Sequence, residues 1–151
     1  MRGYARTPRS IEGVATFAGS DQLAAFADGL DIVVSVLPLT PETTGIMNAG
    51  FFGMLADGAF IINGGRGPQV DDDDLLAALD SGKLGGAALD VFAVEPLPQD
   101  HPFWTHPKVR VWPHVAAQTN ATSAAEQVAA AITAMMDGSE PANRVDWSRG
   151  Y

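Results

Sequence analysis

The sequence predicts an α/β fold in which a parallel sheet is built from short strands joined by crossover helices. Short β-branched runs alternate along the chain with longer runs at helical spacing, which is typical of this class. The run "DIVVSVLP" at 31–38 is apolar at successive positions, as expected for a strand that helices cover on both faces. A chain of 151 residues, 46% of them hydrophobic, has the size and composition of one domain with a sizeable core.

Five runs are predicted as strands, and the segment before the first of them is predicted as a loop. The strands are expected at 14–17, 31–37, 59–63, 87–92 and 109–112. Helices are expected within 20–30, 47–58, 71–85 and 122–138. Ser20 or Asp21 is the expected cap of the first helix, and a glycine near the end of each helical run is expected to stop it.

This order of elements is that of a Rossmann-like doubly wound parallel sheet, but only of part of one. Such a sheet has its first strand at the centre, followed by a phosphate-binding turn of the form G-x-G-x-x-G. The stretch "INGGRGPQV" at 62–70 does not supply that turn, because Val70 stands where the third glycine is needed and Pro68 has no N–H. We therefore predict a partial doubly wound sheet that lacks its first strand and its glycine-rich turn.

Composition excludes several classes of function. The chain has no cysteine, which removes disulfides, thiolate metal sites and a cysteine nucleophile. A formal net charge of −9 with only nine Lys and Arg argues against nucleic acid as a partner. No apolar run approaches the length of a membrane span, and the start lacks a secretory apolar region. We expect no membrane partner and a cytoplasmic location.

Three polar side chains follow successive predicted strands, where open α/β sheets bind ligands. They are Arg66, Glu95 and His114. Each alone has a structural explanation: Arg66 could pair with the acidic run at 71–74, Glu95 could be a solvated loop acid, and His114 could be a structural histidine. Together they suit hydride transfer to a 2-oxo acid, with Arg66 holding the carboxylate, His114 donating a proton to the carbonyl oxygen and Glu95 orienting the imidazole.

Other chemistries fit the sequence less well. His101 and His106 are each followed by proline in a loop and do not form a metal-ligand pattern, so no metal is expected. The acidic run at 71–74 lacks the ligand spacing of a calcium loop and is better explained as the start of a helix. No G-x-S-x-G elbow indicates a serine nucleophile.

Longer stretches resemble a known family. "LPLTPETTG" at 37–45, the run from "INGGRGPQV" to "FAVEPLP" at 62–98, "HPKVRVWPHVAAQT" at 106–119 and the ending "VDWSRGY" are similar to the D-isomer-specific 2-hydroxyacid dehydrogenases, in particular their glyoxylate/hydroxypyruvate reductase branch. The resemblance covers nearly the whole chain. It implies a reductase of small 2-oxo acids to 2-hydroxy acids, with Arg66, Glu95 and His114 as the catalytic residues.

The resemblance also implies a nicotinamide cofactor. Asp90 matches the residue that holds the carboxamide, while the loop beside the cofactor and the strand end under the nicotinamide ribose supply further contacts. These contacts are Leu37, Pro38, Thr40, Thr43, Asn63, Gly64 and Ala116. Arg6, Thr7 and Arg9 follow the second nucleotide-fold strand in the likeness and suit a ribose 2′-phosphate. We therefore expect NADP(H) in preference to NAD(H).

Two departures from the family pattern stand out. Gly65 occupies a position where the family more often has Ala or Ser. The substrate-domain half of the family has no counterpart, so 1–120 is interpreted as the carboxyl-terminal part of a dinucleotide-binding domain and 121–151 as a helix and tail that return toward the absent substrate domain. We expect a homo-oligomer, although the family's dimerisation arm is absent, and little turnover from this chain alone. The alternatives are a non-catalytic dinucleotide-binding module and an inactive truncated relic.

Overall fold

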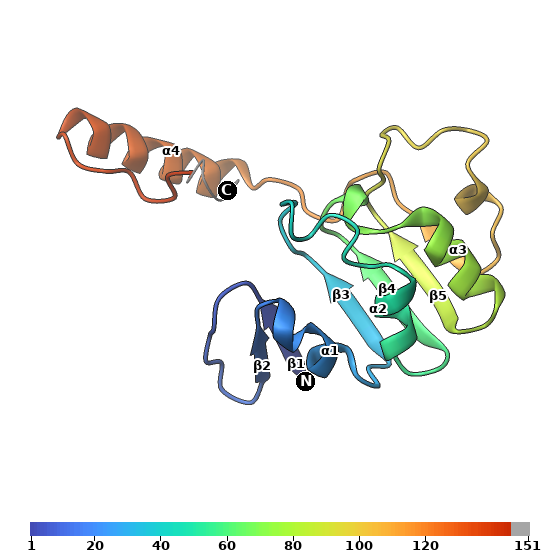
Figure 1. The fold of residues 1–151 in the computed structure, drawn as a ribbon. Coiled ribbons are helices and arrows are strands. Elements are labelled where there is room, and N and C mark those ends of the chain that lie inside the picture. Colours follow the sequence, from blue (N-terminus) through green and yellow to red (C-terminus); the bar gives the residue numbers. More distant parts are fainter. Residues whose placement is uncertain (146–151) are drawn as a thin grey trace. The chain divides into compact units, whose positions relative to one another are not determined.

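The computed structural model describes residues 1–145 and divides into two compact units, which are considered separately. The first unit, Met1–His114, contains six strands and three α-helices (Figure 1). The second, from Val115 onward, contains α4 (Ala121–Met136). All but the first residue of the "VDWSRGY" ending lies outside the described residues. No helix within 1–145 is long and apolar enough to cross a membrane.

Four strands form one parallel sheet in the order β3-β4-β5-β6, which confirms the predicted α/β class. Their bounds are β3 (Ile32–Ser35), β4 (Ala59–Asn63), β5 (Leu84–Leu89) and β6 (Val109–Val111). Because every strand runs in the same direction, all four carboxyl ends lie along one edge of the sheet. The loops that follow the strands therefore begin close together.

A second, two-stranded sheet pairs β1 (Arg2–Ala5) with β2 (Ala15–Ala18) in parallel. The expectation that the chain opens in a loop is therefore wrong, since four residues with one glycine and one arginine are too few to show a strand pattern. The Arg2 guanidinium donates to the carbonyl oxygens of Ala25, Phe26 and Asp28 at 3.3, 3.0 and 2.7 Å. These bonds tie β1 to the end of α1 (Leu23–Ala27), whose last carbonyls need donors.

The two sheets are not hydrogen-bonded to each other, and a cavity of about 250 Å³ lies between β1 and β3. Residues 2–4 line one side of the cavity, and residues 33–37 line the other. A doubly wound sheet has its first strand at this place in the order, between the second and fourth strands. The chain thus forms a partial doubly wound sheet without the first strand, as predicted.

The helices beside the sheet begin at side-chain caps. Asn48 Oδ1 accepts from Phe51 N at 3.1 Å at the start of α2 (Ala49–Met54), and Asp71 Oδ1 accepts from Asp74 N at 3.0 Å at the start of α3 (Asp72–Asp80). The predicted cap of the first helix is wrong, because 20–22 form a short 3₁₀ turn before α1 and neither Ser20 nor Asp21 caps α1.

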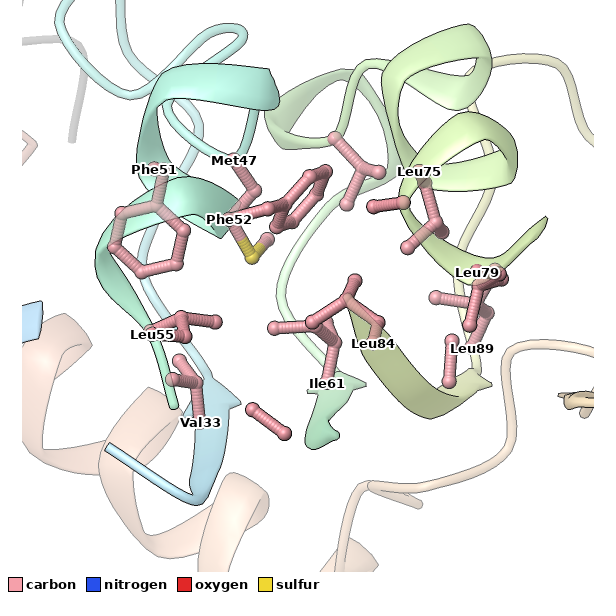
Figure 2. Packing of buried hydrophobic residues seen from close by; sticks show 14 of the residues in the cluster. Val33, Met47, Phe51, Phe52, Leu55, Ile61, Leu75, Leu79, Leu84 and Leu89 are labelled. Carbon is pink, nitrogen blue, oxygen red and sulfur yellow. The ribbon is translucent and has the colours of Figure 1, made fainter. Parts of the chain in front are cut away.

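Side chains from α2, α3 and one face of the sheet form the core (Figure 2). Phe52 on α2, Leu75 on α3 and Ile61 on β4 are each at most 1% exposed. On the other face of β3 and β4, four apolar side chains are 40–59% exposed. They are Ile32, Val34, Phe60 and Ile62. The expectation that helices cover β3 on both faces is therefore wrong for this chain.

Strand β5 begins and ends three residues earlier than the predicted 87–92. Gly85 and Gly86 concealed its start, because glycine is disfavoured in strands unless the chain must approach a neighbour closely. That is the case here, since a Cβ at Gly86 would lie 2.7 Å from the Phe60 ring. The last three residues of the predicted strand, 90–92, instead leave the sheet and begin the loop that contains Glu95.

Candidate active site

Arg66, Glu95 and His114 lie in the loops after β4, β5 and β6, as their positions in the sequence predict. Glu95 Oε2 and His114 Nδ1 are 2.8 Å apart. Arg66 is close enough for its charge to lower the pKa of Glu95. The fold therefore brings one cation, one carboxylate and one imidazole to the same edge of the sheet, while their catalytic roles stay predictions.

The Glu95 carboxylate is held in its charged form. The hydrogen bond from His114 is the largest cause that lowers its pKa, followed by the bond that Phe92 N donates to Oε1 at 2.9 Å, and then by the charges of His114 and Arg66. Because a carboxylate only accepts, Nδ1 of His114 carries the hydrogen in this pair. Nε2 is then the ring nitrogen through which His114 would exchange a proton with a ligand.

The backbone of His114 is in the left-handed region, with φ of 56°. A residue with a Cβ adopts this conformation at a cost of about 1–2 kcal/mol, and such residues cluster at functional sites. The His114 N–H donates to the carbonyl oxygen of Asp90 at 2.8 Å, which helps to hold the conformation. The loop after β5 thus fixes both the ring, through Glu95, and the main chain that carries it.

The main chain of Arg66 is held from both sides by buried side chains. Asn63 Nδ2 donates to the Arg66 carbonyl at 3.1 Å, and Gln69 Oε1 accepts from the Arg66 N–H at 3.0 Å. The exposed Arg66 guanidinium donates to the Gly65 carbonyl at 2.7 Å. Asn63 Oδ1 also accepts from Gly65 N at 3.0 Å, so this side chain shapes the loop, and a cofactor contact from Asn63 stays a prediction.

A tight turn follows β3 at the same edge and contains four of the expected cofactor residues. Thr43 Oγ1 donates to the Pro38 carbonyl and accepts from Thr40 N, both at 2.8 Å. Gln69 Nε2 donates to the carbonyls of Leu37 and Pro38 at 2.9 and 3.0 Å. Gln69 is not among the expected site residues, because in the sequence it is a single polar residue after a glycine-rich loop and no motif marks it.

The remaining expected cofactor residues are spread along the edge. Gly64 follows β4 directly, and Asp90 follows β5 and is 8% exposed, its N–H donating to the Asn63 carbonyl at 3.0 Å. Arg6, Thr7 and Arg9 follow β1 and are exposed. The pKa of Glu42, in the turn after β3, is lowered chiefly by a hydrogen bond from the Thr40 side chain and to a smaller extent by the charge of Arg6, which lies near this turn. Ala116 is exposed and belongs to the second compact unit.

A mostly apolar cavity of about 460 Å³ adjoins the Glu95 and His114 pair. Phe92, Leu97 and Trp104 line it together with the pair itself. The two other histidines of the chain lie elsewhere in the loops and face α3, His101 Nε2 at 3.6 Å from Asp72 Oδ2 and His106 Nε2 at 3.2 Å from Asp80 Oδ1. Within residues 1–145 no three His, Asp or Glu side chains are grouped as metal ligands would be.

Comparison with curated proteins finds relatives that are much longer than this chain. A glyoxylate/hydroxypyruvate reductase A of Serratia proteamaculans is 50% identical over all 151 residues, which cover 48% of that protein. The glyoxylate/hydroxypyruvate reductase A of Yersinia enterocolitica is 48% identical over the same length, again 48% of the protein. The chain spans about half the length of these relatives.

Solved structures of similar proteins match nearly the whole of this chain. A D-isomer specific 2-hydroxyacid dehydrogenase of Xanthobacter autotrophicus, crystallised with NADPH and MES, has a TM-score of 0.96 and 47% identity over 99% of this chain and 62% of its own. An NADPH-dependent glyoxylate/hydroxypyruvate reductase of Sinorhizobium meliloti, in complex with NADP and sulfate, has a TM-score of 0.93 and 41% identity over 99% of this chain and 49% of its own.

The family comparison matches the same region as the compact first unit. The model of the NAD binding domain of D-isomer specific 2-hydroxyacid dehydrogenases matches residues 1–116, which include the strands of both sheets and the loops that carry Arg66, Glu95 and His114. The chain therefore belongs to the D-isomer specific 2-hydroxyacid dehydrogenase family.

Proposed function

We propose that this chain is the carboxyl-terminal part of an NADPH-dependent reductase that converts a small 2-oxo acid, glyoxylate or hydroxypyruvate, into the 2-hydroxy acid. The observation that carries the proposal is the 2.8 Å pair of Glu95 and His114 beside Arg66 at the carboxyl edge of the sheet. The names of the matched relatives support the substrate class.

The three side chains divide the chemistry between them. The Arg66 guanidinium binds the substrate carboxylate with two parallel N–H donors and polarises the adjacent carbonyl. His114 donates the Nε2 proton to the carbonyl oxygen as negative charge develops there. Glu95 accepts from Nδ1, so it orients the ring and stabilises the imidazolium from which the proton leaves. In the oxidative direction His114 is the base.

A nicotinamide coenzyme supplies the hydride in this reaction. Strand β1 takes the place of the second strand of a doubly wound fold, and the segment after that strand binds the adenosine ribose. This segment contains Arg6, Thr7 and Arg9, whose charges and hydroxyl donor suit a 2′-phosphate. NADP(H) is therefore the preferred coenzyme, with NAD(H) as the alternative. NADPH or NADP in three of the matched structures supports this preference.

The described residues include those expected to contact the nicotinamide and the riboses of the coenzyme. They do not include a turn that binds the pyrophosphate, because the sequence contains no G-x-G-x-x-G. In the proposed enzyme that turn and the substrate domain come from the half of the relatives that this chain does not span. Val128, Ile132 and Met135 form an exposed apolar stripe at helical spacing on α4. We assign this stripe to contact with the substrate domain and expect the complete enzyme to be a dimer.

The test joins the amino-terminal half of the Serratia proteamaculans relative to this chain at the start of their match. The joined protein should oxidise NADPH in the presence of hydroxypyruvate or glyoxylate, and more efficiently than NADH. His114→Asn should lower kcat more than it changes KM. A folded joined protein without activity toward either acid would refute the proposal, and the unjoined chain is the control that should show no useful turnover.

A further inference from the structure

We propose that Gln69 is a positioning residue that holds Arg66 and the turn after β3 in one fixed arrangement, and that Gly65 is a glycine because the Gln69 amide and the Leu37 carbonyl that it binds occupy the space beside it. The inference rests on the proposed function in so far as Arg66 grips the substrate and the turn meets the cofactor. The contacts themselves do not depend on that function.

Every polar atom of the Gln69 side chain is used. Gln69 is 0% exposed, and its Oε1 accepts from Arg66 N at 3.0 Å and from Ser35 Oγ at 3.4 Å. Its Nε2 donates to the carbonyls of Leu37 and Pro38 at 2.9 and 3.0 Å. One amide therefore bridges the end of β3, the turn that follows it and the main chain of Arg66. A carboxylate could not donate the last two bonds, and a hydrocarbon would make none of the four.

This bridge joins two expected functional sites, the turn at Leu37 and Pro38 and the loop at Arg66, which are far apart in the sequence. Leu37 and Pro38 begin the turn expected beside the nicotinamide, and Arg66 is the expected grip on the substrate carboxylate. Hydride transfer requires the two reactants to be held in a near-attack arrangement, and a misplacement of about 1 Å can lower the rate about a hundredfold. A rigid link between the two loops would fix the distance between the nicotinamide site and the substrate site.

Gly65 completes the arrangement. A Cβ added at Gly65 would lie 2.4 Å from Gln69 Oε1 and 2.9 Å from the Leu37 carbonyl oxygen, both closer than real Cβ contacts. At the adjacent Gly64 the nearest atom to an added Cβ is the Ser35 carbonyl oxygen at 3.9 Å, an ordinary contact. We therefore attribute the glycine at position 65 to the Gln69 amide and to the Leu37 carbonyl that this amide binds.

The first test uses the purified chain and measures amide hydrogen exchange. Gln69→Ala should accelerate exchange of the Arg66 amide by about tenfold or more relative to the amides of β4, since the bond that protects it is lost. Gly65→Ala should do the same, whereas Gly64→Ala is the matched control that should not. The effects of Gly65→Ala and Gln69→Ala on this exchange should be less than additive in the double variant, because Gln69→Ala removes the 2.4 Å contact with Oε1, although the 2.9 Å contact with the Leu37 carbonyl oxygen remains.

Two results of this test would overturn the proposal. Unchanged exchange at Arg66 in Gln69→Ala would show that the amide does not hold it. Equal acceleration across β4 would show that Gln69 supports the whole fold instead of positioning one loop. Fully additive effects of Gly65→Ala and Gln69→Ala on this exchange would show that the two residues do not interact.

The second test uses the joined reductase and separates this inference from the proposed function. Gln69→Ala should lower kcat per folded molecule by about tenfold or more and should also weaken NADPH binding, because both loops move. Arg66→Lys should impair use of the 2-oxo acid while leaving NADPH affinity nearly unchanged. Normal kcat and NADPH affinity in Gln69→Ala would overturn the positioning role. An inactive parent protein would refute the proposed function, and the exchange measurement would still decide the role of Gln69.

Discussion

Neighbouring residues on β4 lie in opposite environments. Ile61 lies beneath α2 and α3 (Figure 2) and is 0% exposed. Its neighbour Ile62 is 40% exposed on the other face of the sheet. The same contrast separates Val33, at 6% exposed, from Val34, at 59%, on β3. Both members of each pair are equally apolar, so the difference comes from what covers the two faces and not from the strands themselves.

The contrast shows that these strands have the composition of a sheet buried on both faces. Parallel strands read as continuous apolar runs because crossover helices normally cover each side. In the first unit, α2 and α3 pack against only one side of the sheet, which we call the covered face. The opposite side, which we call the bare face, exposes Ile32, Val34, Phe60 and Ile62. A chain that spans about half of its relatives is expected to leave such a surface.

The largest effect that separates the faces is expected from two phenylalanines. Phe52→Ala, on α2 at 1% exposed, should lower the free energy of unfolding by about 3–5 kcal/mol, because it leaves a cavity in the core. Phe60→Ala, on the bare face at 50% exposed, should cost about 1 kcal/mol. Urea unfolding of the purified variants measures both. Comparable losses would contradict the assignment of the two faces.

A polar replacement at adjacent positions sharpens the same comparison. Ile61→Thr should cost about 2 kcal/mol, because it removes buried apolar surface and buries a hydroxyl. Ile62→Thr should change the free energy of unfolding by less than about 0.5 kcal/mol. It should also reduce any self-association through the bare face, which light scattering measures. Equal costs at the two positions would mean that the bare face is covered in solution.

The covered elements were the most predictable from sequence. The pattern at 59–63 predicts β4 at its observed bounds, and the acidic run at 71–74 is correctly interpreted as the start of a helix, α3. The failures have local causes. β1 is too short to show a period, and Gly85 and Gly86 disguise the start of β5, where a neighbouring ring excludes any larger side chain.

The expected catalytic residues could be predicted from the sequence, but the residue that holds Arg66 in place could not. Arg66, Glu95 and His114 follow strand ends, and topology alone brings such positions to one edge. Gln69 could not be found in this way, since its importance depends on the carbonyls of Leu37 and Pro38, which only the folded chain brings within hydrogen-bonding distance. Nor did the pattern of β3 reveal that one of its faces lacks a cover, because that depends on the rest of the protein.

The caps offer a smaller and more local comparison. Asn48→Ala should lower the free energy of unfolding of the first unit by about 1 kcal/mol, because the N–H of Phe51 loses its acceptor and α2 forms part of the covered face. Asn120→Ala removes the equivalent cap of α4, a helix with no buried residue. It should reduce helical circular dichroism while leaving the unfolding midpoint of the first unit unchanged. A midpoint shift as large as that of Asn48→Ala would contradict this prediction.

The smallest effect is expected at Asp72 in the first turn of α3. Burial is the largest cause that raises the pKa of this carboxyl, and the charge of His101 opposes it. A carboxyl whose pKa is higher in the folded state holds its proton more tightly there, so its contribution to stability is complete below the unfolded pKa and declines as pH rises through the folded pKa. Asp72→Asn should abolish that decline, which urea unfolding across the acidic range would detect as a flatter pH profile.

The exposed Asp73 in the same turn provides the control, because Asp73→Asn removes a similar favourable interaction with the helix dipole. If both variants flatten the profile equally, the dependence arises from the helix terminus and not from the burial of Asp72.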